Sequence, residues 1–106
     1  MSLELKVEKH LRKKVGRDFL DLIILSKLGN GGPTSGYDFI GLIHEKYGVI
    51  ISSGTIYSKL YSLEREGFIT GCFNERKRVY KITDLGKKFA DAAQETVQHI
   101  IETILK

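Results

Sequence analysis

The fold is decided by residues 49–82, whose sequence is VIISSGTIYSKLYSLEREGFITGCFNERKRVYKI. Its first half predicts a helix over residues 53–66, with Ser52 and Ser53 as the N-cap signal and Gly67 at the end. The apolar residues of this helix recur at helical spacing along one side, and they are Ile56, Leu60 and Leu63. A stripe of this kind is typical of a helix that packs one side against a core.

The second half of the same stretch changes from a period of 3.6 to a period of 2. Residues 68–73 and 78–82 alternate in this way and are rich in β-branched and aromatic side chains. Residues 74–77 between them are polar and short enough for a hairpin tip. The sequence therefore predicts a two-stranded β-hairpin directly after the helix.

A further helix precedes this stretch and ends at Gly48, in the position that favours glycine after a helix. Thr34 or Ser35 can cap its start. Its apolar and aromatic residues lie three or four apart: Tyr37, Ile40, Ile43 and Tyr47. Only a short link separates it from the helix over residues 53–66, so the two are expected to form a helix-turn-helix.

Two more helices are expected at the amino-terminal end. The first carries an apolar residue at every fourth position and ends near Gly16; these residues are Leu3, Val7, Leu11 and Val15. Asp18 can cap the second helix, which is apolar on most sides and should be the most buried one. This helix is expected to stop before Gly29, where a connector rich in glycine begins.

A long carboxy-terminal helix is predicted after Thr83, another capping residue. A helix of roughly twenty residues is about 30 Å long and extends past the core of so small a domain. Its apolar stripe should therefore need a second copy of the chain. The expected homodimer interface comprises Phe89, Ala93, Val97, Ile100, Ile101 and Ile104.

The predicted fold class is mainly α, a winged helix-turn-helix with a two-stranded wing and an extra helix at each end. One domain is expected over residues 1–106. It divides into an amino-terminal helix (1–16), a helix-turn-helix with its wing (17–82) and a dimerisation helix (83–106).

Composition is compatible with a polyanionic partner without proving one. Seventeen Lys and Arg against thirteen acidic residues give a net charge of +4, and the sequence pI is about 9.2. Cys72 is the only cysteine, so no disulfide within the chain is expected. No apolar run is long enough to span a bilayer, and residues 1–5 lack the basic segment followed by an apolar segment that marks a signal peptide. A soluble, cytoplasmic protein is expected.

The candidate binding surface combines the helix over residues 53–66 with the hairpin. The outward side of the helix offers hydroxyl and basic groups, and these are Thr55, Ser58, Lys59, Ser62 and Arg65. Short polar side chains allow close approach to a major groove and can bond base edges or phosphates. Arg76, Lys77 and Arg78 at the hairpin suit the DNA backbone or an adjacent minor groove, and Ser52 and Ser53 could help hold a phosphate at the helix start. Solvated surface residues would explain either element alone, whereas the combination favours double-stranded DNA.

Several separate motifs resemble those of the PadR family of transcriptional regulators. They are Gly36-Tyr37-Asp38, Ser53-Gly54-Thr55-Ile56-Tyr57, Leu63-Glu64 with Gly67-Phe68-Ile69, and Arg78-Val79-Tyr80-Lys81-Ile82-Thr83 with Gly86. The resemblance implies a dimeric repressor with Thr55, Tyr57, Ser58 and Lys59 at or near DNA and Arg78 in the wing. With only one helix after the wing, the chain resembles the short branch of the family. A dimer of this kind should bind an inverted-repeat operator.

Other classes of function have weaker support. No metal is expected, because the candidate ligands His10, His44, His99 and Cys72 are not spaced as metal ligands are. No catalytic set of residues and no phosphate-loop motif occurs, so neither a cofactor nor an enzyme activity is expected. The sequence leaves open whether a small-molecule effector binds, and it does not identify one. The main alternative is a winged helix that binds protein, which would favour an apolar or acidic outer side on residues 53–66.

Overall fold

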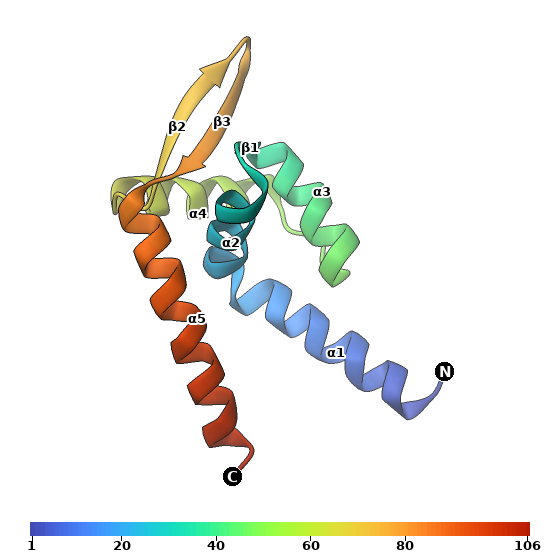
Figure 1. Ribbon diagram of the computed structural model, residues 1–106. Coiled ribbons are helices and arrows are strands. Elements are labelled where there is room, and N and C mark those ends of the chain that lie inside the picture. Colours follow the sequence, from blue (N-terminus) through green and yellow to red (C-terminus); the bar gives the residue numbers. More distant parts are fainter.

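A computed structural model describes all residues, 1–106, as five helices and a small antiparallel sheet (Figure 1). The elements in chain order are α1 (Leu3–Asp18), α2 (Leu20–Gly31), β1 (Thr34–Ser35), α3 (Gly36–Tyr47), α4 (Ser53–Arg65), β2 (Ile69–Asn74), β3 (Lys77–Ile82) and α5 (Asp84–Ile104). Helices α3 and α4 form the helix-turn-helix, and β2 and β3 form the wing. The expected winged helix with an extra helix at each end is confirmed.

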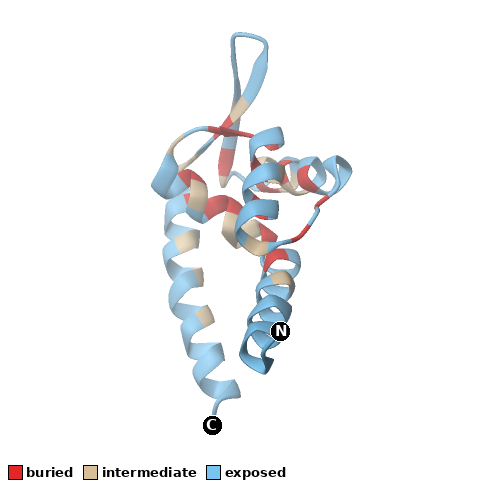
Figure 2. Ribbon diagram, turned by 90° about the vertical axis from the view of Figure 1, so that its right-hand side faces the viewer, coloured by how far each residue is buried: buried red, intermediate tan, exposed pale blue.

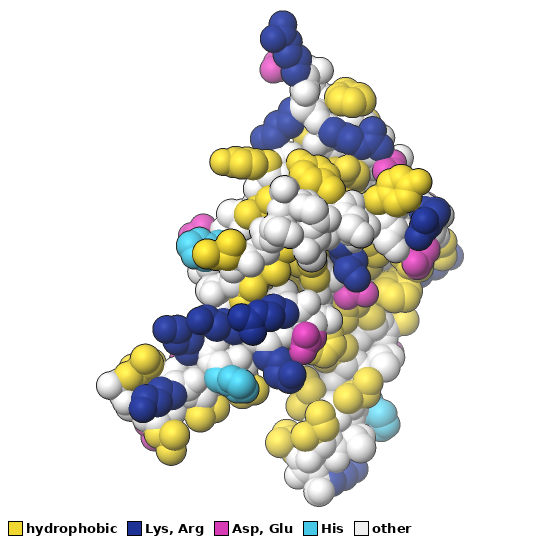
Figure 3. Space-filling model, turned by 180° about the vertical axis from the view of Figure 1, so that it is seen from behind, with side chains coloured by type: hydrophobic (Ala, Val, Ile, Leu, Met, Phe, Trp, Pro, Cys, Tyr) yellow, Lys and Arg dark blue, Asp and Glu magenta, His cyan; other side chains and the backbone are white.

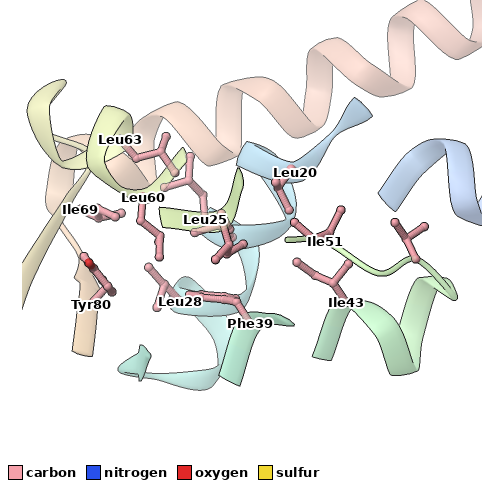
Figure 4. Close-up of a cluster of buried hydrophobic side chains, with 13 residues drawn as sticks. Leu20, Leu25, Leu28, Phe39, Ile43, Ile51, Leu60, Leu63, Ile69 and Tyr80 are labelled. Carbon is pink, nitrogen blue, oxygen red and sulfur yellow. The ribbon is translucent and has the colours of Figure 1, made fainter. Parts of the chain in front are cut away.

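One cluster of thirteen buried apolar side chains lies between α2, α3, α4 and the base of the wing. Helix α2 supplies four of them, as expected of the most buried helix: Leu20, Ile24, Leu25 and Leu28. Phe39 of α3 and Leu60 of α4 point toward this helix (Figure 4). The core therefore holds the inner side of α4 rigidly and leaves its outer side free.

The start of each helix of the helix-turn-helix is capped by a serine. The Ser35 hydroxyl accepts a hydrogen bond from the Asp38 amide, and the Ser52 hydroxyl accepts one from the Thr55 amide, each at 3.1 Å. Gly48 ends α3 with a φ of 70°, a left-handed conformation that costs glycine little. These signals fix the short turn between α3 and α4 as predicted.

The sheet has three strands in the order β1-β3-β2, one more than the sequence predicts. Strand β2 pairs with β3 from Ile69↔Ile82 to Asn74↔Lys77, so only Glu75 and Arg76 form the tip. Strand β1 pairs with the other edge of β3 through Thr34 and Ser35. Two residues are too few to show an alternating pattern, which is why β1 was not predicted.

The expected boundary between the first two helices is wrong. Helix α1 continues to Asp18, because Gly16 is buried within it and its missing side chain lets Tyr47 and Val49 pack closely. Asp18 does not cap α2 but forms an ion pair with Lys14 (3.3 Å). The residue at the start of α2 is Phe19, which makes no side-chain capping bond.

The expected end of α2 is also wrong, since the helix continues past Gly29 to Gly31. Gly32, with a φ of 78°, follows as the C-cap. The break comes where the backbone adopts a positive φ, rather than at the first glycine of the cluster.

Helix α5 begins where the sequence predicts, with the Thr83 hydroxyl accepting a hydrogen bond from the Gly86 amide (3.0 Å). Gly86 is required there, because a Cβ atom would collide with the Phe68 carbonyl oxygen. The helix then extends away from the core, and its distal half is largely exposed (Figures 1 and 2). Ile104 is 73% exposed.

Candidate nucleic-acid interface

Helix α4 separates its side chains into an inner and an outer side. Ile56 and Leu60 are fully buried on the inner side, and Leu63 is 5% exposed. On the outer side the candidate residues Thr55 and Ser58 are exposed, while Lys59 and Ser62 are half-buried at its margins. The predicted polar surface therefore exists, on a helix that the core holds in place.

The amino end of α4 uses Ser52 internally and leaves other groups available. The Ser52 hydroxyl accepts from the Thr55 amide and donates to the Thr55 hydroxyl at 2.9 Å. Ser53 is exposed. The Thr55 hydroxyl therefore still has its own hydrogen to donate, next to the first free amides of the helix.

Tyr57 lies where the start of α3 meets α4. Its ring packs directly on Gly36, where an added Cβ atom would lie 2.6 Å from Tyr57 Cε1. The side chain is nevertheless 45% exposed. Tyr57 thus joins the two helices through its ring and remains accessible from the outer side of α4.

A carboxylate that the sequence analysis did not select ties the wing to α4. Glu64 Oε2 accepts a hydrogen bond from the Gly71 amide on the free edge of β2 (2.9 Å). Both Glu64 oxygens also accept from Arg78 Nη2 at 3.0 Å. The Gly71 amide foremost, and then Arg78, hold the pKa of Glu64 below its usual range.

Arg78 therefore lies against the wing rather than extending freely from it. Its guanidinium lies 5.7 Å from the Phe73 ring centroid and 5.6 Å from that of Tyr80, within cation–π range. Only Nη2 is bonded to Glu64, so donors remain on Nη1 and Nε.

The other two basic residues of the wing differ in their contacts. Lys77 forms an ion pair with Asp38 at the start of α3 (3.1 Å). The Ser35 hydroxyl and then Lys77 hold the pKa of Asp38 below its usual range. Arg76, at the tip, is exposed and forms no ion pair.

Two exposed side chains extend the outer side of α4 beyond the predicted set. Tyr61 is 65% exposed, and the Arg65 guanidinium lies 5.4 Å from its ring centroid. Arg65 was expected on this side, whereas Tyr61 was not among the predicted residues. Counting about 100° per residue places Tyr61 next to Arg65 and opposite Leu63, a signal already present in the sequence.

The face that carries α4 and the wing has several acidic side chains interspersed among its basic ones (Figure 3). Lys and Arg side chains gather on the wing and, on the other side of α4, along α1. The polar surface of α4 lies between these two groups. This arrangement is complementary to a polyanion such as the DNA backbone.

The structure contains no cluster of three or more His, Cys, Asp or Glu side chains able to hold a metal ion. Cys72 is an exposed free thiol on β2. None of the helices combines the length and the apolarity that crossing a membrane requires.

Residues 24–92 match the family model for the transcriptional regulator PadR-like family. A transcriptional regulator from Clostridium thermocellum has a similar structure, with 32% identity, coverage of 86% of this chain and 91% of that chain, and a TM-score of 0.77. A transcriptional regulator from Thermoplasma acidophilum has 32% identity over 82% of this chain and 90% of that chain, with a TM-score of 0.64. Bacillus subtilis PadR in complex with operator DNA has 31% identity and a TM-score of 0.62, over 73% of this chain and 47% of that chain. No curated protein sequence matches the chain. The chain belongs to the PadR-like family of transcriptional regulators.

Proposed function

We propose that this protein binds double-stranded DNA sequence-specifically as a homodimer, acts in the cytoplasm, and represses transcription by occupying an inverted-repeat operator. The observation that carries the proposal is the hydroxyl-rich outer side of α4, held rigidly by the core beside a basic wing. Operator binding by the related Bacillus subtilis PadR supports it.

The side chains of α4 divide into those that read bases and those that position the helix. Thr55, Ser58, Lys59 and Ser62 face outward or lie at the margin of the outer side, so they meet base edges when the helix enters a major groove. Ser52, Ser53 and Tyr57 lie at the amino end or the edge of the helix, where hydroxyls and free amides suit phosphate oxygens.

The basic residues of the wing contact the backbone next to that groove. Arg76 is free to do so directly. Arg78 can keep Glu64 on Nη2 and present its remaining donors to a phosphate. Lys77 has to share its ammonium group between Asp38 and DNA.

The dimer interface is formed by α5 with part of α1. An open apolar groove of about 790 Å³ runs between α1, α2, α3 and α5. Val97, Ile100, Ile101 and Ile104 form its α5 wall, and Leu11 and Val15 contribute from α1. Exposed apolar surface of this extent fits a helix of a second copy, with Phe89 and Ala93 closer to the core.

Selection of bound fragments from a random DNA pool tests the function. The expected product is an inverted repeat whose half-sites are one helical turn, or a multiple of it, apart. Thr55→Val and Ser58→Ala should change the selected bases, whereas Lys87→Gln on α5 serves as a control and should not. Enrichment of no sequence would contradict the proposal and favour a protein-binding winged helix.

A further inference from the structure

The amino-terminal helix α1 carries a stripe of basic residues that the proposed function leaves unused. Its members are spaced three or four apart, Lys6, Lys9, Lys13 and Arg17. At about 100° per residue they fall within about 80° of the helix circumference. The carboxylates of α1, which belong to Glu4, Glu8 and Asp18, lie on the opposite side.

No carboxylate neutralises this basic stripe. The ion pairs of α1 involve Arg12 with Glu8 (2.6 Å) and Lys14 with Asp18 (3.3 Å), and neither of these cations belongs to the stripe. Lys6, Lys9 and Arg17 are exposed, and Lys13 is half-buried. Four positive charges therefore lie side by side without an acidic partner, an arrangement that attracts a polyanion.

Packing holds α1 against the end of α3 and the link that leads into α4. Buried Gly16 allows α1 to pack against Tyr47 and Val49, which lead into the start of α4. Arg12 Nη1 also donates to the Lys46 carbonyl oxygen at 3.1 Å. The basic side chains of α1 consequently share a face with α4 and lie across α4 from the wing (Figures 1 and 3).

We propose that the basic stripe of α1 is a second phosphate-binding surface for the same DNA duplex. The inference rests on the proposed function, because it assumes that α4 lies in a major groove. Such a groove has a phosphate strand on each side, and the wing can reach only one of them. The stripe covers about 16 Å, comparable to four or five phosphates of one strand at about 3.4 Å each along the axis. The stripe lies outside residues 24–92, which match the family model.

The test compares two double variants that remove the same charge. The stripe variant is Lys6→Gln combined with Lys9→Gln, and the control variant is Lys14→Gln combined with Lys106→Gln. Affinity for the selected operator and for random duplex is measured between 0.05 and 0.2 M salt, and circular dichroism verifies folding. Loss of two phosphate contacts in each protomer should lower the salt slope of the dimer by about 3.6, so the stripe variant loses about 150-fold less affinity across this range than wild type. The control should keep the wild-type slope.

An unchanged slope in the folded stripe variant would overturn the inference while leaving the proposed function intact. Absence of salt-dependent DNA binding by the wild type would instead contradict the proposed function. Vesicles containing phosphatidylserine provide a further arm. If the wild type bound them, and the stripe variant lost that binding without any change in DNA affinity, the surface would be a membrane contact and the inference would be wrong.

Discussion

Replacing Ile100 and Ile104 of α5 by glutamate should convert the protein into a monomer. Both side chains line the apolar groove and are more than half exposed in one chain. A carboxylate at either position would have to be buried without a partner in the dimer, whereas water would solvate it in the monomer. The substitutions should therefore oppose association without harming the fold of one chain.

The exposed fractions of these residues give the size of the effect. Complete burial of an isoleucine contributes about 1.5–3 kcal/mol. Ile100 is 52% exposed and Ile104 is 73% exposed. Covering the remaining surface of both residues in both protomers would stabilise a dimer by about 6 kcal/mol, or about four powers of ten in the dissociation constant. The buried charges would add to this loss.

Sedimentation velocity over a concentration series measures the change directly. The control Gln98→Glu with His99→Glu adds the same charge on the polar side of α5 and should leave the wild-type association unchanged. The Ile100→Glu, Ile104→Glu variant should stay helical by circular dichroism and bind operator far more weakly. An unchanged dimer in this variant would show that α5 does not form the interface.

Three further substitutions test other parts of the structure. Gly86→Ala should destabilise the fold by about 1–3 kcal/mol because the Phe68 carbonyl leaves no room for a methyl group, and thermal unfolding with Gly41→Ala as control measures this. Because its pKa is lowered in the folded protein, the Asp38 carboxylate stabilises the fold at pH values above the unfolded pKa of about 3.9. This contribution is lost as the pH falls through the lower, folded pKa. The melting temperature of Asp38→Asn should therefore fall less between pH 7 and pH 3 than that of the wild type. Arg76→Ala should lower the salt slope of DNA binding by about one contact without changing the melting temperature, and an unchanged slope would exclude the wing tip from the interface.

The helix-turn-helix could be predicted because its signals are local. Ser35, Gly48 and Ser52 each act on a neighbouring backbone group, and the stripe of α4 depends only on helical spacing. The long apolar stripe of α5 could be read for the same reason. Features of this kind are present in the order of residues before any tertiary contact forms.

Two of the misses concern residues whose role depends on distant parts of the chain. Gly16 looked like the end of a helix, yet it lies inside one because Tyr47 and Val49 pack against it. Glu64 was not selected as a site residue, because its partners Gly71 and Arg78 become neighbours only when the hairpin folds back. No local pattern could have revealed these contacts.

The link from Glu64 to both wing strands has a consequence for the thermodynamics of DNA binding. Because this carboxylate bonds the edge of β2 and a side chain of β3, the angle between α4 and the wing is set when the protein folds. Little conformational entropy then remains to be lost when DNA is bound, so the unit is preorganised. Deforming α4 and its wing within one protomer would first require breaking the hydrogen bonds of Glu64. A ligand or modification that changes DNA affinity therefore acts most effectively through α5, by changing the distance between the two copies of α4 and its wing.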